Sequence, residues 1–287
     1  LNDLTQSELI FNNFILLRFE PLFWQTSFML ITIFVIINGI KNGIEKWSKI
    51  MMPFIIILLI ILAIRGLLLD GGVEGLKFLF KPKFDLITPH SIVLALGHSF
   101  FTLSLGMGTM VAYGSYLNNK QNLFISGIWI IIVDTFIALI AGIAIFSTVF
   151  ASGSEPQEGA GFIFTVLPII FNQLIGGQLW STIFFTLLFM AALTSSISLL
   201  EVVTSYFVDE RKWSRKKSTI IFGVIIIIIG MLCSLSLGGG LNISPFKNIT
   251  FFDLMDQLSS KYMLPIGGLL VSLFIIFEFK VSNFIIE

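Results

Sequence analysis

Seven apolar segments, each long enough to cross a lipid bilayer, constrain this sequence more than any other feature. A membrane-spanning helix needs about 20 predominantly apolar residues. We therefore expect an all-α polytopic membrane protein in which residues 1–287 form one membrane domain. Segments 123–151 and 179–206 are notably long, so we expect them to tilt or to extend beyond the bilayer. The expected spans are residues 21–40, 50–69, 90–117, 123–151, 179–206, 218–237 and 251–278.

Charged residues are scarce and balanced in sign. They make up 12% of the chain, whereas about 25% is usual in soluble domains. The 17 basic residues equal the 17 acidic residues in number, which implies no nucleic-acid partner. The single cysteine, Cys233, excludes an intrachain disulfide and a cysteine-based metal cluster. No catalytic motif stands in a suitable context, so we do not expect an enzyme.

The distribution of lysine and arginine among the loops predicts the orientation. Cytoplasmic loops carry an excess of these residues, so we expect segments 41–49, 118–122 and 207–217 to be cytoplasmic. Segment 152–178 contains two glutamates and no lysine or arginine. We interpret it as an extracellular capping loop, in which the apolar run 161–171 is too short to span. The first span then enters the membrane from outside.

Both ends of the sequence look like cuts in a longer protein. The residues from Leu1 onward show neither the basic region nor the cleavage-site pattern of a signal peptide. If the preceding N-terminus is cytoplasmic, we expect an odd number of earlier spans.

The stretch 98–108 (HSFFTLSLGMG) predicts a helix that is interrupted within an expected span. In this stretch two glycines, Gly106 and Gly108, follow the hydroxyl side chains of Thr102 and Ser104. Glycine in a helix interior costs about 1 kcal/mol relative to alanine and permits backbone angles that other residues avoid. A broken backbone at membrane depth is tolerated only where protein or a water-filled cavity satisfies its polar groups. We therefore expect a binding site at this break.

Asp134 is the only acidic residue within the expected span 123–151. An ionised carboxylate at the bilayer centre costs about 2.5–3.5 kcal/mol on insertion scales, so it usually faces a partner or a cavity. Asp134 could bind a cation or a proton, or it could form a structural hydrogen bond to a neighbouring helix. The usual role of intramembrane acids favours the first interpretation.

Ala191, Thr194 and Ser195 share one helix face because they are spaced three and four residues apart. One carbonyl and two hydroxyls on that face would supply uncharged oxygen ligands, which suit a monovalent cation. Serine and threonine also mediate helix packing in membranes, so the spacing alone favours a structural role.

Three further polar or helix-breaking features have two interpretations each. Glu201 could belong to a polar cytoplasmic pathway or could pair near the end of its helix. Asp253 and Asp256 open the last span, where acids in a first turn favour the helix dipole, so capping suffices to explain them. Gly43 and Pro53 could mark a helix end that unwinds, although ordinary helix punctuation also explains them.

Four motifs resemble, in the same order, those of the bacterial branch of the neurotransmitter:sodium symporter family. They are GIEKWSKIMMP, FFTLSLGMGTMVAYGSYL, FMAALTSSISLLE and DERKWSRKK. The resemblance covers nearly the whole chain. It implies a partial LeuT-type fold, in which two inverted repeats of five helices surround a midplane site. This chain would supply the fourth to tenth helices, with the sixth unwound at mid-membrane, and three missing helices agree with the predicted orientation.

The resemblance implies two sodium sites, each incomplete in this chain. Thr102 and Asp134 match positions of the first site. Ala191, through its carbonyl, and Thr194 and Ser195, through their hydroxyls, match the second site. A carboxylate at Asp134 can supply the negative charge that chloride-dependent relatives take from a bound anion, so we do not expect chloride.

The same resemblance implies a substrate pocket, gates and an unwinding motif. Tyr116 and Asp209 match the cytoplasmic gate, and Asp256 matches the extracellular gate. Gly43 with Pro53 resembles the motif whose unwinding admits water toward the second sodium. The substrate-binding positions are Phe101, Thr102, Ser104, Met107, Ser195 and Leu199.

Together these features predict sodium-coupled symport of an amino acid, or a related small amine-carboxylate, across the plasma (inner) membrane by alternating access. The expected partners are the substrate, sodium ions and the lipid bilayer; no particular amino acid and no oligomeric state is assigned. The alternative is a non-transporting membrane protein, or a degenerate fragment that lacks the first repeat. An intramembrane enzyme would need a nucleophile–base pair or metal ligands on facing helices, and the sequence offers neither.

Overall fold

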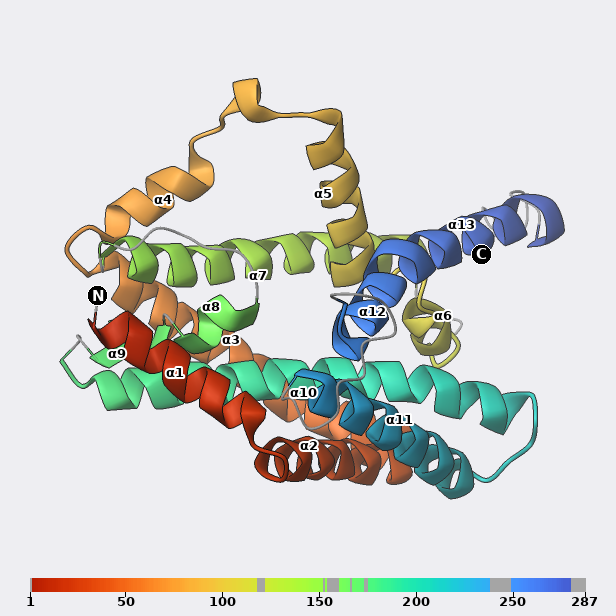
Figure 1. Cartoon of the computed structure of the whole chain (residues 1–287). Coiled ribbons are helices and arrows are strands. Elements are labelled where there is room, and N and C mark those ends of the chain that lie inside the picture. The colour runs from red at the N-terminus through yellow and green to blue at the C-terminus, as the bar shows by residue number, and fades with distance from the viewer. Residues whose placement is uncertain are drawn as a thin grey trace. The chain divides into compact units, whose positions relative to one another are not determined.

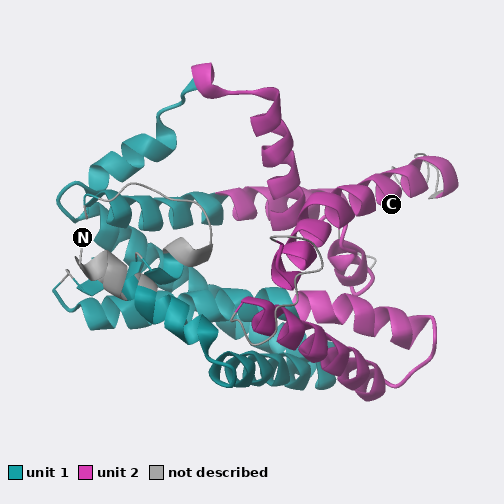
Figure 2. Cartoon of the chain, in the orientation of Figure 1, with its two compact units in different colours: residues 1–83, 136–196, 238–240 teal, residues 84–135, 197–237, 241–287 magenta. Residues whose placement is uncertain are grey.

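In a computed structural model, the chain is built from helices that divide between two compact units (Figure 1, Figure 2). The two longest helices, α7 (Leu123–Ala151) and α10 (Gly177–Asp209), each contribute to both units. Unit 1 comprises residues 1–83, 136–196 and 238–240, and unit 2 comprises residues 84–135, 197–237 and 241–287. The structure describes residues 2–117, 122–151, 153, 160–165, 167–172, 175–237 and 249–279.

Unit 1 contains the helices of the first part of the chain, together with the later part of α7 and the earlier part of α10. Its π-helical turn, η1, joins α2 to α3. The elements are α1 (Asn2–Leu16), α2 (Glu20–Ile37), η1 (Ile40–Glu45), α3 (Lys46–Leu67), α4 (Gly72–Phe80), α8 (Ala160–Thr165) and α9 (Leu167–Asn172).

Unit 2 contains the earlier part of α7, the later part of α10 and the C-terminal helices. Two π-helical turns, η3 and η4, flank α13. The elements are η2 (Phe84–Leu86), α5 (Pro89–Thr102), α6 (Thr109–Gly114), α11 (Arg215–Leu237), α12 (Phe251–Gln257), η3 (Leu258–Met263), α13 (Leu264–Phe274) and η4 (Ile275–Phe279).

Among the described residues, six helices are both long and apolar enough to cross a membrane. They are Glu20–Ile37, Ile40–Leu67, Leu123–Ala151, Gly177–Asp209, Arg215–Leu237 and Phe251–Glu278. The prediction of an all-α polytopic protein is confirmed. The expected span 90–117 is not continuous, because it is divided between α5 and α6. The membrane limits of the seven spans stay predictions.

Two of the expected loops lie partly outside the described residues. In the expected cytoplasmic loop 118–122, only Asn122 is described. In the expected capping loop 152–178, the structure describes α8, α9 and a few flanking residues. The predicted sidedness of both loops stays a prediction.

The core of unit 1 is formed where α2, α3 and α10 contribute buried side chains. Val35 and Ile36 of α2 are almost completely buried, and Leu193 of α10 is 4% exposed. The rings of Phe28 and Phe189 meet edge to face with their centroids 5.6 Å apart. Lipid tails are as apolar as these side chains, so close packing and interhelical hydrogen bonds, rather than removal from water, hold such helices together.

Two helices of unit 2 begin with reciprocal capping. At the start of α5, the Ser91 amide donates to the Thr88 hydroxyl at 3.1 Å, and Pro89 occupies the first turn. At the start of α12, the Asp253 amide donates to the Thr250 hydroxyl at 3.1 Å, and the Thr250 amide donates to the Asp253 carboxylate at 3.1 Å. Both arrangements satisfy amides that a helix N-terminus otherwise leaves unpaired.

Candidate functional site

The predicted interruption of the span 90–117 is confirmed. α5 ends at Thr102 and α6 begins at Thr109 (Figure 1). Residues 103–108, here called the unwound segment, therefore leave the helical path. The Leu105 amide donates to the carbonyl of Phe100 at 2.8 Å. This bond reaches back five residues, whereas the regular α-helical bond reaches back four.

Three residues of the unwound segment adopt left-handed backbone angles. Gly106 has φ of 80° and Gly108 has φ of 81°, which glycine adopts without steric cost. Ser104 has φ of 54°, which is uncommon for a residue with a side chain. A left-handed angle at a residue other than glycine costs about 1–3 kcal/mol, and such residues gather at ligand-binding sites.

Four of the six residues that the sequence assigned to the substrate lie in the unwound segment or directly before it. Thr102, Ser104 and Met107 are half-buried, whereas Phe101 is exposed. The Thr102 hydroxyl donates to the Ser99 carbonyl over a long 3.4 Å. A hydroxyl has two acceptor lone pairs, so this contact leaves the Thr102 oxygen able to accept a cation.

Asp134 lies in α7 within the same unit and is half-buried. In the described part of the chain, no hydrogen bond or ion pair joins it to Thr102. The structure therefore places both residues in unit 2 without a hydrogen bond between their side chains. Their shared role at the first sodium site stays a prediction.

The second predicted set of sodium ligands occupies α10 in unit 1. The Thr194 hydroxyl donates to the Ala191 carbonyl at 2.8 Å, so two of the predicted oxygens lie side by side. Ser195 and Leu199 are exposed. The structure thus contains a hydrogen bond between Thr194 and Ala191. Coordination of an ion by these oxygens stays a prediction.

A hydrogen bond to α2 anchors the helix beside these oxygens. The hydroxyls of Thr32 and Ser196 lie 2.8 Å apart, and Thr32 is completely buried. Ser196 follows directly after the predicted ligands in α10. A fixed interhelical bond at this position restricts the rotation of α10, and hence the direction of the hydroxyls of Thr194 and Ser195.

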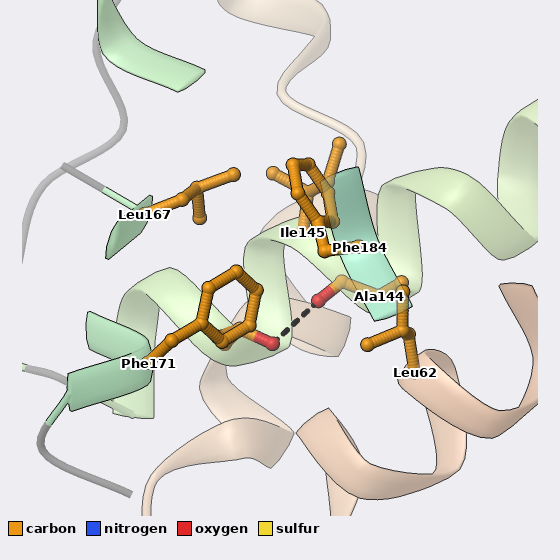
Figure 3. Close-up of a pocket in the computed structure, with 7 residues that line it drawn as sticks. Leu62, Ala144, Ile145, Leu167, Phe171 and Phe184 are labelled. Carbon is orange, nitrogen blue, oxygen red and sulfur yellow. Dashed lines mark hydrogen bonds between the residues drawn. The ribbon is translucent and has the colours of Figure 1, made fainter. Parts of the chain in front are cut away.

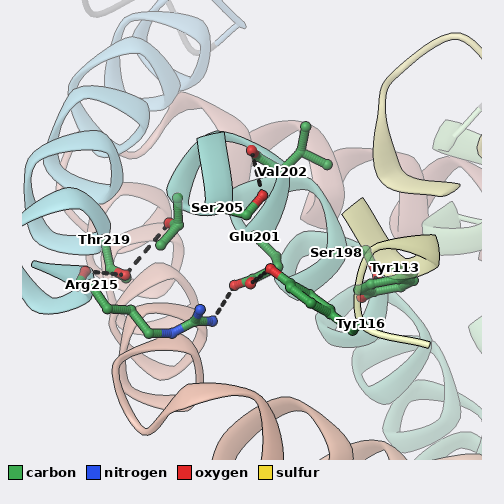
Figure 4. Close-up of polar contacts among 9 residues, drawn as sticks. Tyr113, Tyr116, Ser198, Glu201, Val202, Ser205, Arg215 and Thr219 are labelled. Carbon is green, nitrogen blue, oxygen red and sulfur yellow. Dashed lines mark hydrogen bonds and ion pairs between the residues drawn. The ribbon is translucent and has the colours of Figure 1, made fainter. Parts of the chain in front are cut away.

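The best-formed polar cluster in unit 2 surrounds Glu201 (Figure 4). The Glu201 side chain is completely buried in α10. Arg215, in the first turn of α11, donates to one of its oxygens, and Tyr116 donates to the other at 2.7 Å. One turn earlier in α10, the hydroxyls of Ser198 and Tyr113 lie 2.7 Å apart. This cluster ties α10 to α11 and to the residues around the end of α6.

The cluster bears on the prediction for Glu201 and contains one residue, Arg215, that the sequence did not identify. Glu201 forms an ion pair with Arg215, as one of its two interpretations proposed. The sequence identified Tyr116 but not Arg215, because the basic residues of 207–217 indicate orientation and belong to a family motif without showing which acid they pair with. Asp209, the other predicted cytoplasmic gate residue, is exposed at the end of α10, and the structure gives no contact between it and Tyr116.

The two acids at the start of the last span behave differently. Asp253 caps α12, as the simpler interpretation proposed. The Asp256 side chain is exposed, and its backbone carbonyl accepts hydroxyl bonds from Ser259 at 3.1 Å and Ser260 at 2.6 Å. The side chain of Asp256 is therefore accessible, and its gating role stays a prediction.

Gly43 lies in the π-helical turn η1, and Pro53 lies inside α3. Gly43 is buried, and a Cβ there would stand 2.0 Å from the carbonyl oxygen of Val35, so no side chain fits. Pro53 is exposed and cannot donate a backbone hydrogen bond. The wide turn and the missing donor both weaken the helical ladder, as the unwinding interpretation requires.

A small, mostly apolar pocket in unit 1 does not coincide with the predicted site (Figure 3). Thr148 has the only polar side chain in its lining, and its hydroxyl donates to the Ala144 carbonyl at 2.7 Å. The pocket therefore offers no spare side-chain donor to an anion or a carboxylate. Its lining residues are Leu62, Ala144, Ile145, Thr148, Leu167, Phe171 and Phe184.

Comparisons with known proteins agree with one another. A family model described as "Sodium:neurotransmitter symporter family" matches residues 17–287. An uncharacterised sodium-dependent transporter of Bacillus subtilis is 41% identical over 263 residues, which are 92% of this chain and 58% of the relative. An uncharacterised sodium-dependent transporter of Haemophilus influenzae is 34% identical over 267 residues, which are 91% of this chain and 57% of the relative.

A solved structure resembles the chain over almost its whole length. It is the crystal structure of MhsT in complex with L-phenylalanine, which is 44% identical, with a TM-score of 0.84. The match covers 96% of this chain and 62% of that one. The chain thus spans about three-fifths of the length of the relatives it matches.

Proposed function

Because this chain belongs to the sodium:neurotransmitter symporter family, we propose that it carries part of the sodium and substrate sites of an amino-acid symporter. The family is a transporter family whose relatives are named sodium-dependent. The fold is a partial LeuT-type fold of a multi-pass membrane protein.

The unwound segment is the observation that carries the proposal. Its non-helical backbone lies between two helices, whereas the six candidate spans found among the described residues are continuous helices. Freed backbone groups inside a membrane need protein, water or a ligand as partners. The segment follows directly after the hydroxyl of Thr102, so backbone and side-chain oxygens are available to one small ion and one polar substrate.

Two sodium ions are the proposed co-substrates. Thr102 and Asp134 would contribute to the first site, and the carbonyl of Ala191 with the hydroxyls of Thr194 and Ser195 to the second. The second set contains only neutral oxygens, which suit a monovalent cation. Each set holds fewer oxygens than a buried ion requires, so the remaining ligands would come from the substrate or from helices outside this chain.

The proposed substrate is an amino acid or a related amine-carboxylate. Phe101 and Met107 offer apolar surface near the break, and Ser104 offers a hydroxyl. Ser195 and Leu199 would border the same region from α10. The solved relative with an amino acid bound, MhsT with L-phenylalanine, makes L-phenylalanine the first probe to test.

Chloride is not a proposed co-substrate. The carboxylate of Asp134 would place a fixed negative charge beside the first sodium, where it offsets the charge of the cation. Ala138, one turn further along α7, offers no ionisable group. The proposed location is the plasma membrane, where an inward sodium gradient can drive uptake.

Alternating access would depend on groups that close and open the site at its cytoplasmic and outer ends. On the cytoplasmic side, Tyr116, Glu201 and Arg215 would hold α6, α10 and α11 together while the site is closed. Asp209 and, on the outer side, Asp256 would pair with groups outside this chain. Loosening of the helix between Gly43 and Pro53 would then let water reach the second sodium from the cytoplasm.

The test is uptake by a full-length transporter that contains this chain, reconstituted into liposomes. Labelled L-phenylalanine is supplied first, and the other proteinogenic amino acids follow, with external sodium or with external potassium. We expect uptake of at least one amino acid in sodium and almost none in potassium. Equal rates in the two salts would refute sodium coupling. No uptake of any amino acid would favour the alternative, a non-transporting membrane protein.

A further inference from the structure

Two consecutive glycines of α13, Gly267 and Gly268, lie directly against the unwound segment of the same unit. A Cβ built on Gly267 would stand 2.1 Å from the carbonyl oxygen of Gly106. In the opposite direction, a Cβ built on Gly106 would stand 2.4 Å from the carbonyl oxygen of Leu264 and 2.7 Å from the amide of Gly268. At this point two backbones touch with no side chain between them.

Gly268 also makes room for the last turn of α5. A Cβ at Gly268 would stand 2.2 Å from an edge atom of the Phe100 ring. Phe100 immediately precedes Phe101 and Thr102, the residues proposed for substrate and sodium. The same glycine pair therefore contacts the chain on both sides of the point where α5 ends.

We propose that Gly267 and Gly268 are positioning residues that set where the unwound segment lies, and so align the groups that bind sodium and substrate. The inference rests on the proposed function of that segment. The physical reason is the lack of free space: real Cβ atoms essentially never approach other atoms closer than 3.0 Å. A methyl group at position 267 must push the Gly106 backbone and α13 apart, and this changes where the unwound segment lies relative to α13.

The two glycines differ in what a methyl group would meet, and this difference gives the test its control. At Gly267 the obstacle is a backbone carbonyl, which no substitution of a neighbouring side chain removes. At Gly268 the obstacle is the rim of a phenylalanine ring, which a smaller side chain at position 100 removes. Phe100→Leu should therefore rescue Gly268→Ala and should leave Gly267→Ala impaired.

The experiment measures KM and maximal rate of sodium-driven uptake by the full-length transporter, with the amino acid that the wild type carries. Gly127→Ala is the matched control, because a Cβ at Gly127, on a helix of the same unit, meets nothing within 4 Å. We expect Gly267→Ala to raise KM by about tenfold or more, since a displacement of about 1 Å at a binding site can cost about a hundredfold. Gly127→Ala should keep the wild-type KM.

The second measurement compares Gly268→Ala alone with Gly268→Ala combined with Phe100→Leu. We expect Gly268→Ala to raise KM less than Gly267→Ala, and Gly268→Ala with Phe100→Leu to return KM to that of Phe100→Leu alone. A purely structural role would lower the amount of folded protein and the maximal rate, and would leave the KM of the surviving protein unchanged. If Gly267→Ala does not yield folded protein, the rescue at position 268 decides.

The outcomes separate the two proposals. A wild type that transports, together with unchanged KM in Gly267→Ala and Gly268→Ala, overturns the positioning role and leaves the proposed function intact. A wild type that carries no amino acid in sodium refutes the proposed function, and the positioning role is refuted with it. Raised KM in both glycine variants, with rescue only at position 268, supports the inference.

Discussion

The Glu201 carboxylate has no exposed surface, yet it accepts hydrogen bonds from both Arg215 and Tyr116. Burial of a charge is tolerated when a partner of opposite charge and further donors surround it. The three residues come from α10, from the start of α11 and from the end of the α6 region. A single side chain thus connects three parts of unit 2.

Replacement of Arg215 should reveal the free-energy cost of burying the Glu201 carboxylate. Breaking a buried ion pair by deleting one partner typically costs about 3–5 kcal/mol. We expect Arg215→Ala to lower the thermal unfolding midpoint of the detergent-solubilised full-length protein, and Glu201→Gln added to it to restore most of the loss. Arg211→Ala, at an exposed arginine in the turn that precedes α11, is the control. Equal midpoints for Arg215→Ala and Arg211→Ala would contradict the role of the pair.

Asp134 supports a second prediction at the scale of one residue. If its carboxylate supplies the negative charge at the first sodium, replacement of chloride by gluconate should leave wild-type uptake unchanged. Asp134→Asn removes that charge with little change in shape, so it should raise the sodium concentration needed for half-maximal uptake by about tenfold, equivalent to about 1.4 kcal/mol. Wild-type uptake that collapses in gluconate would show that the carboxylate does not replace the anion.

The role of a residue was predictable from the sequence where a single position carries an unusual group. A contact between two residues was much less predictable. An acid in an apolar span, or two glycines beside hydroxyls, is visible in the sequence. The partner of Glu201 is not, because Arg215 lies fourteen positions later, beyond the end of α10. Only the turn between α10 and α11 brings its guanidinium back to the carboxylate.

At the scale of elements, the division between α5 and α6 was predictable and the turn η1 was not. Glycines with φ near 80° explain the first, because their conformational freedom is a property of the residue itself. At the π-helical turn Ile40–Glu45, a Cβ on Gly43 would stand 2.0 Å from the carbonyl oxygen of Val35 in α2. The sequence shows the glycine but not the carbonyl that it meets.

Pro53 should link the stability of α3 to the rate of transport. Proline in a helix interior costs about 3 kcal/mol relative to alanine, so Pro53→Ala should raise the unfolding midpoint. If loosening of this helix opens the cytoplasmic path, the same variant should slow maximal uptake several-fold, with little change in KM. Met52→Ala, at the exposed neighbouring position, is the control. A stabilised variant with undiminished uptake would argue against the unwinding role.

The bond between α2 and α10 gives a further prediction about elements. Thr32→Val keeps the shape of the side chain and removes the hydroxyl that meets Ser196. Interhelical hydrogen bonds in membranes contribute about 0.6 kcal/mol on average, so the midpoint should fall only slightly. The sodium requirement of uptake should rise, because α10 can then rotate beside the second site. Thr182→Val is the control, since that exposed hydroxyl bonds only within α10. An equal sodium requirement in both variants would contradict this role of the bond.

At the scale of the whole molecule, fold class and family were predictable because they depend on patterns spread over the chain. Hydropathy repeats over seven segments, and four motifs occur in family order. Contacts between distant segments were not predictable in the same way. The approach of Gly106 to Gly267 joins residues more than 150 positions apart, and glycine alone does not indicate which backbone it will meet.

The central claim is that sodium and an amino acid cross the membrane together through a site that includes the unwound segment. The most direct measurement is uptake of radioactive sodium into liposomes containing the full-length transporter, with and without the amino acid it carries. We expect the amino acid to accelerate sodium entry in the wild type, and Thr102→Val to abolish most of that acceleration. Sodium entry that is the same with and without every amino acid tested would contradict the account.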